Sequence, residues 1–467
     1  MVEVKEAVVV SLLDVYSEVD AQEEVATSKV SSFRSIVAFW LLGLINNSGY
    51  VIMMAVAKDI APGAVGVVFL ADVAPTMVVK ISAPYWFHLV PYGVRVCLCA
   101  VLMFLSFVTV GYGRSTGMQL LGVCFSSLQG GLGEASLLAL SSFYDTPRAL
   151  TAWSSGTGFA GIFGYAWVVL FKFWLGLSFR ASLMTANVLV LFWLYAYFIL
   201  LVNPNSPLSN GNGVISSDTT DEVRFEADSP LAFQQLTTSP SLNSNGEQHN
   251  CIVEREEVEC ASPSEASRGR SSRVGSGEAR PSRAATMTAF DRFRFTLGLW
   301  RFTVPLMLVY FAEYTMQTGT WSAIGFPVVS ASARQHFYEY ANWSYQGGVF
   351  ISRSSGTILR LSPLWLWSLP VLQLLLLLFF YLIAVDHFWY DNSLLFLCFG
   401  VGLVGGLGYV NAFQLVAEAV PSDLTELALA SASVGDSFGV MFSDIFGTFV
   451  QACVYKRNGI PGAWATC

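Results

Sequence analysis

The sequence has few charged residues. Lys, Arg, Asp and Glu make up 12% of its 467 residues, whereas ordinary soluble domains carry about 25%. Hydrophobic residues make up 54%, more apolar surface than a soluble core of this length could bury. The stretch 365–384 contains no charged residue, and about 20 apolar residues are enough to cross a bilayer as a helix. We therefore expect an integral membrane protein with many spans, surrounded by the lipid bilayer.

The sequence also lacks the motifs of common enzyme classes. It contains no P-loop, no HExxH pair and no GxSxG nucleophile turn. Clustered basic residues with exposed aromatics, which mark nucleic-acid binding, are missing as well. The eight cysteines form no framework, although Cys453 and Cys467 could pair if their end of the chain faces an oxidising lumen. We expect no enzymatic activity, no cofactor, no metal site and no nucleic-acid partner.

Apolar stretches of spanning length occur at eleven places along the chain. The fold expected is therefore an all-α integral membrane protein with about 11 transmembrane helices in two halves of six and five. The second, fourth, eighth and eleventh stretches are more polar than the rest. The expected spans are residues 36–57, 64–87, 93–112, 118–142, 149–171, 181–202, 298–320, 340–360, 364–384, 393–413 and 425–451.

Composition and charge divide the chain further. The polar middle segment has too few apolar residues to fold alone, so it is expected to be a long disordered cytosolic loop. The distribution of Lys and Arg near the span ends favours a cytosolic N-terminus and a lumenal C-terminus. The sequon at Asn342 would then lie at a lumenal membrane edge. The expected domains are a disordered acidic cytosolic tail (1–33), an N-terminal six-helix half (34–202), a cytosolic linker (203–292), a C-terminal five-helix half (293–452) and a lumenal tail (453–467).

A G-x-G-x-x-G string lies inside an apolar stretch at Gly156, Gly158 and Gly161. A dinucleotide-binding loop would need a preceding strand and a following helix. Here the small residues instead predict close helix packing. The pairs Gly402 with Gly406 and Gly435 with Gly439 have the same interpretation.

Ionisable residues inside spans are energetically unfavourable and usually mark a pathway or an ion pair. Some could simply pair between helices, such as Asp72 with Lys80, or an acid with Arg301. Their spread over both halves favours a polar cavity. The spacing of helical residues also places Asn46 with Tyr50, and Tyr310, Glu313 and Gln317, close to a shared face. The intramembrane ionisable residues are Asp72, Lys80, Glu134, Arg301, Glu313, Asp436 and Asp444.

Several segments resemble the battenin family, in order and in both halves. The strings are Phe39 to Asn47, Ala71 to Thr76 with Lys80, Trp153 to Gly158, Val309 to Tyr314, Gly348 to Ser355, Tyr409 to Asn411 and Asp436 to Gly439.

The resemblance implies a lysosomal or vacuolar membrane protein distantly related to the major-facilitator transporters. It links the chain to lumenal pH homeostasis, to basic amino acids in fungal vacuoles and to export of glycerophosphodiesters. Glu313, Arg353 and Asp436 occupy positions of the family's charged motifs, and Gly158 to Gly161 lie in its glycine-rich fifth span.

We therefore expect an alternating-access transporter of a small polar metabolite, with a glycerophosphodiester favoured and proton coupling possible. Its midplane site would bind substrate between the halves. Two alternatives remain: transport of a basic amino acid such as arginine, or a non-transporting scaffold acting through the loop. Trafficking proteins could bind 203–292 in either case. The candidate substrate-binding residues are Lys80, Arg301, Asn46, Tyr50, Tyr310 and Gln317; the proton-coupling candidates are Glu134, Glu313 and Asp436; and the motif residues are Asp72, Arg353, Gly156, Gly158 and Gly161.

An anionic phosphodiester needs a cation in the cavity, and Lys80 is the best-placed candidate, with Arg301 adding a bidentate contact. Alternatively, Lys80 could extend to the cytosolic interface. A basic amino acid would instead depend on Glu134, Glu313 and Asp436.

Overall fold

The computed structural model describes residues 33–56, 60, 65–202, 283–463 and 465–467. Most of the expected N-terminal tail, and residues 203–282 of the expected linker, lie outside this range. The described residues form helices joined by short connections, and none of them is in a strand. This agrees with the all-helical fold expected from hydropathy.

The first half consists of the helices before residue 203. Serine and aspartate side chains begin several of them: Ser115 accepts a hydrogen bond from the backbone of Met118, and Asp145 accepts one from that of Arg148. Such caps satisfy N–H groups at the ends of helices. The elements are α2 (Phe33–Ala55), α4 (Val65–Trp86), η1 (Phe87–Leu89), α5 (Tyr92–Tyr112), α6 (Thr116–Leu140), η2 (Ser141–Phe143), α7 (Thr146–Val168), η3 (Val169–Trp174), α8 (Phe179–Thr185), α9 (Val188–Tyr195) and η4 (Ala196–Leu200).

The second half begins with a short helix and a capped one. Thr288 and Asp291 form reciprocal hydrogen bonds at the start of α11, the arrangement known as a capping box. The elements are α10 (Arg283–Thr286), α11 (Ala289–Gly298), α12 (Trp300–Thr315), η6 (Met316–Thr320), η7 (Trp321–Ala323), α13 (Ala331–Ser354), α14 (Pro363–Asp386), α15 (Leu394–Ala419), α16 (Thr425–Ala432) and α17 (Val434–Arg457).

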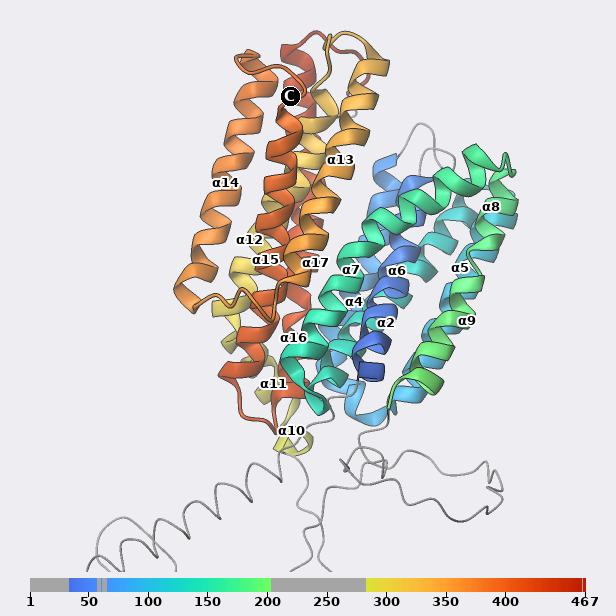
Figure 1. Cartoon of the computed structure of the whole chain (residues 1–467), viewed down its shortest axis with the longest axis vertical. Helices are drawn as coiled ribbons and strands as arrows, with labels where there is room; N and C mark the ends of the chain where they lie inside the picture. The colour runs from blue at the N-terminus through green and yellow to red at the C-terminus, as the bar shows by residue number, and fades with distance from the viewer. Residues whose placement is uncertain (1–32, 57–59, 61–64, 203–282, 464) are drawn as a thin grey trace, which may run out of the picture.

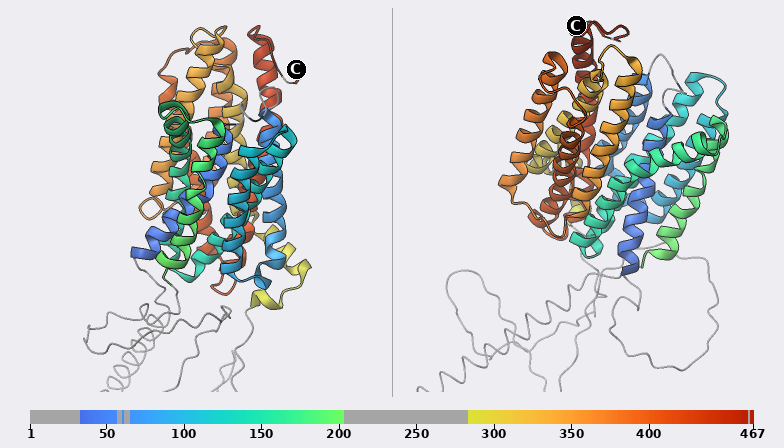
Figure 2. Two further views of the ribbon diagram at one scale, coloured as in Figure 1. Left: turned by 90° about the vertical axis from the view of Figure 1, so that its right-hand side faces the viewer. Right: turned by 45° about the horizontal axis from the view of Figure 1, so that its top comes forward.

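The two halves lie side by side as bundles with their helices along one direction (Figure 1). The C-terminus lies at one end, called here the upper end, and α10 and α11 lie at the opposite, lower end in all three views (Figures 1 and 2). Helices α7, α4 and α6 of the first half contact α13, α15, α16 and α17 of the second. These contacts form the interface in which a site between the halves must lie.

Seven described helical segments are long and apolar enough to cross a membrane, or eight if the bent pair of α11 with the segment from Trp300 to Ala323 is one span. Helices α4, α6 and α13 are not among these segments. They carry the charged and polar side chains that face the interior, such as Lys80, Glu134 and Arg353, each of which has a buried or half-buried side chain. Large apolar side chains such as Leu191, Phe396 and Ile445 are exposed on the outer surface, as expected for a lipid-facing surface.

Three expected boundaries differ from the structure. The eighth span was placed at 340–360, but α13 begins at Ala331, where Ser330 caps it. Its first turns are amphipathic, so average hydropathy misses them. Asn342 is therefore buried well inside a helix and not at its end. Since buried asparagines are inaccessible to glycosylation, we expect no glycan there.

The expected linker extended to residue 292, but its described end is ordered and helical. Arg292 is buried and donates hydrogen bonds to the carbonyl oxygens of Pro84 at 2.5 Å and Ala284 at 2.6 Å. This arginine attaches α11 to the lower end of α4. At the other end of the chain, α17 continues to Arg457, beyond the expected boundary at 452, and Cys453 forms a disulfide with Cys467.

The glycine strings lie at close helix contacts, as predicted. A Cβ atom on Gly156 would collide with the carbonyl oxygen of Trp40 on α2, and one on Gly402 with that of Tyr345 on α13. Gly158 and Gly161 instead face α13 of the other half. Gly156 and Gly402 thus bring helices together within each half, while Gly158 and Gly161 let the halves approach each other.

Gly156→Ala is expected to lower the unfolding temperature, because overpacking of a tight contact costs about 1–3 kcal/mol. The matched control is Gly400→Ala on α15, where an added Cβ meets nothing within 4 Å. The control should leave the unfolding temperature unchanged or raise it slightly, since alanine favours helices. Thermal unfolding of the purified protein in detergent measures both. Equal unfolding temperatures for the two variants would contradict the assignment of Gly156 to a close contact.

Candidate functional site

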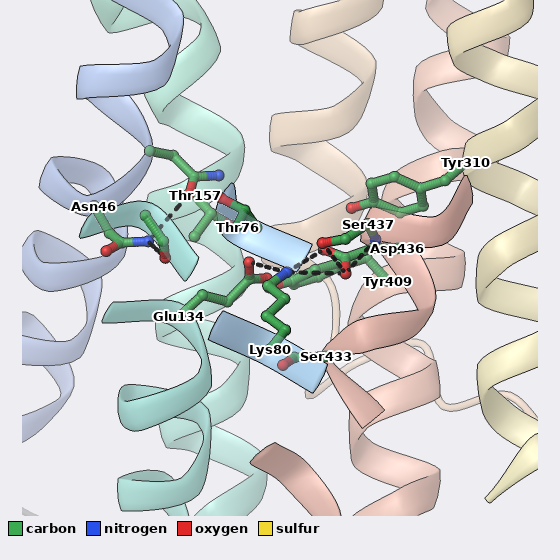
Figure 3. A network of polar contacts seen from close by, with 12 residues as sticks. Asn46, Thr76, Lys80, Glu134, Thr157, Tyr310, Tyr409, Ser433, Asp436 and Ser437 are labelled. Atoms are coloured by element: carbon green, nitrogen blue, oxygen red, sulfur yellow. Dashed lines mark hydrogen bonds and ion pairs between the residues drawn. The ribbon is translucent and has the colours of Figure 1, made fainter. Parts of the chain in front are cut away.

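Lys80 is buried at the interface between the halves, where two carboxylates bind it. Its Nζ lies 2.7 Å from Glu134 Oε2 on α6 and 3.0 Å from Asp436 Oδ1 on α17 (Figure 3). The Lys80 side chain is 1% exposed, against 12% and 10% for the two acids. We call these three residues the ion cluster. With all three charged, it carries one net negative charge, and it joins α4 and α6 of the first half to α17 of the second.

Aromatic side chains lie next to the ion cluster. The hydroxyl of Tyr409 on α15 donates a hydrogen bond of 2.6 Å to Glu134 Oε1 and accepts one of 3.2 Å from the indole of Trp153 on α7. Tyr409 also packs under the guanidinium of Arg353, which lies 4.0 Å from the ring centre. Such a cation–π contact stabilises the charge in a buried site.

Arg353 is the second buried cation at this interface. It donates hydrogen bonds of 2.6 Å to the hydroxyls of Thr157 on α7 and Tyr310 on α12. Its Nε has no hydrogen-bond partner, and among the described residues no acidic side chain forms an ion pair with it. A buried guanidinium without an ion-pair partner is unfavourable, and so it is suited to bind an anionic ligand.

A cavity lies between the halves, on the upper side of these cations. Its volume is about 50 Å³, enough for a few water molecules and well below the range of small-molecule sites, so the cavity is narrow in this conformation. Tyr314, four residues after Tyr310 and stacked on it at a centroid distance of 5.8 Å, connects the cavity wall with the Arg353 site. We call this space the central cavity. Its wall comes from α2, α4, α7, α12, η6, α13 and α17 and comprises Tyr50, Val51, Met54, Val73, Tyr165, Tyr314, Gln317, Thr318, Tyr338, Asn342, Gln346 and Asp444.

Below the central cavity, side chains of the two halves bond to each other. Gln414 Nε2 donates to Thr151 Oγ1 at 3.0 Å, and the hydroxyls of Ser155 and Ser354 lie 2.8 Å apart. Nearby, Tyr92 donates to Glu426. Together with the ion cluster, these bonds connect the two halves at the lower end of the interface.

Three expectations about cations are wrong. Arg301 lies in the first turn of α12 with its side chain exposed, so it does not reach the central cavity. Lys80 does not extend to the membrane interface, because carboxylates from two other helices hold it inside. Asp72 is not its partner, and Asp72 Oδ2 is buried without a hydrogen bond.

The remaining candidates fall in different places. Tyr50 and Gln317 line the central cavity as expected for a site between halves. Asn46 instead faces α6, where it donates to the Gly130 carbonyl and accepts from Gln129.

Glu313 lies within the second half. It accepts hydrogen bonds from Tyr345 at 2.8 Å and from Gln373 at 3.4 Å, and its carboxylate packs against Gly405 of α15. The described residues offer it no ion-pair partner. It is therefore separate from the ion cluster.

Sequence reasoning missed Tyr165, Tyr314 and Tyr338 in the cavity wall, and it listed Asp444 among the intramembrane charges without assigning it a role. Helical spacing carried a usable signal: Tyr338, Asn342 and Gln346 recur every four residues, as Tyr310 and Tyr314 do. Residues four apart lie on one helix face. A polar stripe of this kind in a membrane-spanning helix predicts that the helix lines a water-filled cavity inside the protein.

Comparisons with known proteins agree with the resemblance in the sequence. A family profile described as CLN3 protein matches residues 37–456. Protein btn-1 of Neurospora crassa is 34% identical over 415 residues, which cover 86% of this chain and 84% of the relative. Battenin of Canis lupus familiaris is 30% identical over 452 residues, which cover 89% and 90%.

Solved structures with a similar fold are major-facilitator transporters. A variant of the E. coli fucose:proton symporter FucP has a TM-score of 0.51 at 13% identity, covering 92% of this chain and 93% of its own. The human organic anion transporter MFSD10 has a TM-score of 0.50 at 11% identity, covering 91% and 96%. At such low sequence identity, structural similarity establishes the fold but does not identify the substrate. The sequence match over nearly the whole described range shows that the chain belongs to the CLN3, or battenin, family.

Proposed function

We propose that this protein is a lysosomal or vacuolar membrane transporter that exports a small polar metabolite, with a glycerophosphodiester favoured. The observation that carries the proposal is Arg353, which is buried between the halves without an ion-pair partner among the described residues. It bonds to Tyr310, which stacks on the cavity-lining Tyr314. A phosphodiester has one negative charge and two free oxygens, which a guanidinium can bind in a bidentate manner. Alternating access would carry it across through relative motion of the halves.

The topology that fits this proposal has eleven spans, six before and five after the linker. Helices α4, α6 and α13 have 22, 25 and 24 residues, enough to cross a bilayer. The lower end is then cytosolic, together with the N-terminus and the segment 203–292, to which trafficking proteins could bind. The upper end is lumenal, and the disulfide of Cys453 with Cys467 favours that side.

We further propose that protonation of the ion cluster couples transport to protons and makes it depend on lumenal pH. A proton on Glu134 or Asp436 would leave Lys80 with a single carboxylate and make the cluster neutral. The positive charge of Lys80 could then add to the electrostatic potential that attracts an anion to Arg353. Loss of the bond to Asp436 would also weaken the attachment between the halves, because Lys80 and Asp436 belong to different halves.

Glu134→Gln and Asp436→Asn are each expected to flatten the pH dependence of transport. Glu313→Gln should retain it, because Glu313 bonds only within the second half. The measurement is phosphodiester efflux from proteoliposomes over a series of lumenal pH values. If all three variants keep the original pH profile, proton coupling through these groups is wrong.

A second candidate substrate is a basic amino acid such as arginine. Asp444 in the cavity wall favours it, since the carboxylate could bind a side-chain cation. Arg353 would repel the side-chain cation of a bound arginine, but it could bind the carboxylate of that amino acid.

The proposed function is tested with the purified full-length chain in proteoliposomes loaded with glycerophosphodiesters or arginine, against protein-free liposomes. Phosphodiester efflux supports the proposal, and efflux of arginine alone supports the second candidate. A variant lacking 210–280 distinguishes a transporter from a scaffold. A transporter should keep its flux without this segment, whereas loss of flux would indicate that the loop is essential for activity. Metabolite profiling of organelles with and without the protein then identifies the natural cargo.

A further inference from the structure

Helix α11 has an apolar face that no other described part of the chain covers. Phe290 is 71% exposed, Phe293 49% and Leu297 57%. At about 100° per residue, these three side chains lie within about 60° of one another around the helix. Arg292, whose hydrogen bonds attach α11 to the lower end of α4, lies on the opposite side and is buried. The helix is therefore attached to the bundle by one face and turns its apolar face outward.

The direction of α11 differs from that of the helix that follows it. The segment from Trp300 to Ala323 is bent by 63° relative to α11, so α11 does not continue the line of α12. The left view of Figure 2 shows α10 and α11 projecting from the side of the bundle at its lower end. A helix that lies across the end of a bundle with an apolar face turned outward is typical of an amphipathic helix in a membrane surface.

Tryptophans next to α11 mark the level of the membrane surface. Trp300, which begins α12, is 52% exposed, and its ring centre lies 6.0 Å from that of Trp367 on α14. Trp365, in the first turn of α14, is 64% exposed. Exposed tryptophans are enriched where the hydrocarbon of a bilayer meets its headgroups. Since α11 lies directly beside this level, its phenylalanines can reach the acyl chains of the nearest leaflet.

Two exposed arginines lie beside the apolar face. Arg294 is about 40° from Phe290 around α11, and Arg301 lies in the first turn of α12. Both side chains are exposed, and neither forms an ion pair with an acidic side chain of the described residues. Basic side chains at a membrane surface attract anionic lipid headgroups. In the proposed topology the lower end is cytosolic, and the cytosolic leaflet is the one that carries such lipids.

We infer that α11 is a membrane-surface helix that binds an anionic phospholipid, with Phe290, Phe293 and Leu297 among the acyl chains and the two arginines at the lipid phosphate. Helix α11 contacts α4 of the first half and α16 of the second. A lipid held here therefore lies beside both halves at the end where they must separate. The content of anionic lipid in the surrounding leaflet should influence that separation. This site is distinct from the central cavity, and its lipid does not depend on which metabolite is transported.

Native mass spectrometry of the full-length protein in detergent measures the Kd for two added probes, phosphatidylserine and phosphatidylcholine. The unmodified protein should bind phosphatidylserine more tightly. Arg294→Gln combined with Arg301→Gln should weaken phosphatidylserine binding about 30-fold, at about fivefold for each arginine, and leave phosphatidylcholine binding nearly unchanged. The matched control is Arg114→Gln combined with Arg457→Gln. It removes the same charge from exposed arginines outside α11 and α12 and should retain the preference.

Phe290→Ser combined with Leu297→Ser tests the apolar face separately. This variant should weaken the binding of both lipids by a similar factor, because the polar side chains no longer enter the acyl layer. Light scattering of the purified protein detects the other possible occupant of this face, a second copy of the chain. Three results would each overturn the lipid site: a preference for phosphatidylserine that survives without the two arginines, unchanged lipid binding in the serine variant, or a native dimer that the serine variant dissociates. All four residues are exposed, so these substitutions should leave the fold intact.

Discussion

Arg353→Gln is expected to lower kcat/KM for a glycerophosphodiester at least about 100-fold, the scale for removing a buried charge that binds an opposite charge. Arg353→Lys should retain part of the activity, because an ammonium supplies the charge without the bidentate geometry. The glutamine variant should remain folded, since Arg353 has no carboxylate partner among the described residues that would be left unpaired. Efflux from proteoliposomes measures the effect.

The matched control is Arg360→Gln. Arg360 is 54% exposed and lies 3.5 Å from the exposed Glu418, a type of pair that contributes little to stability. Its variant should transport normally. If Arg353→Gln transported phosphodiesters as well as the control does, Arg353 would not be the anion site and the proposed function would lose its main support.

Lys80→Gln is expected to have the largest effect on stability. The substitution leaves Glu134 and Asp436 facing each other in a buried site without their cation, and breaking a buried ion pair in this way costs about 3–5 kcal/mol. The unfolding temperature in detergent should fall clearly. Phosphodiester transport should be lost, whereas any binding of arginine should persist or improve, because a positive charge has been removed.

A triple variant separates the electrostatic cause from other effects of the lysine. Lys80→Gln combined with Glu134→Gln and Asp436→Asn replaces all three charges by neutral groups of similar shape. It should recover most of the lost stability, since no buried charge is left unpaired. It should not recover pH-dependent transport. A triple variant as unstable as Lys80→Gln would contradict the electrostatic explanation.

Hydropathy predicted most of the fold because membrane helices are local features of the chain. The expected spans and the observed helices agree closely at 93–112 against α5 and at 364–384 against α14. Helix α13 was misplaced because its first turns are amphipathic. The family was also predictable, since its motifs are short strings that need no three-dimensional information.

The partners of the charges could not be predicted in the same way. Helical spacing tests only neighbours within one helix, so Asp72 was the natural partner to consider for Lys80. The actual partners, Glu134 and Asp436, lie on α6 and α17, and only the packing of several helices brings them together. The same limit applies to Arg301 and Arg353. The side chain of Arg301 is exposed, whereas that of Arg353 is buried, and the packing of the helices decides this difference.

The ion cluster is asymmetric with respect to the two halves. Lys80 and Glu134 belong to the first half, while Asp436 belongs to the second. If the lower end opens, the first half keeps a neutral lysine–glutamate pair, and the second half is left with a lone carboxylate facing the opening. That carboxylate must acquire water, a proton or a passing cation before the halves can separate fully. Opening of the lower end therefore exposes a carboxylate on one half alone, so the rate of the conformational change should respond to the protons and cations present on that side of the membrane.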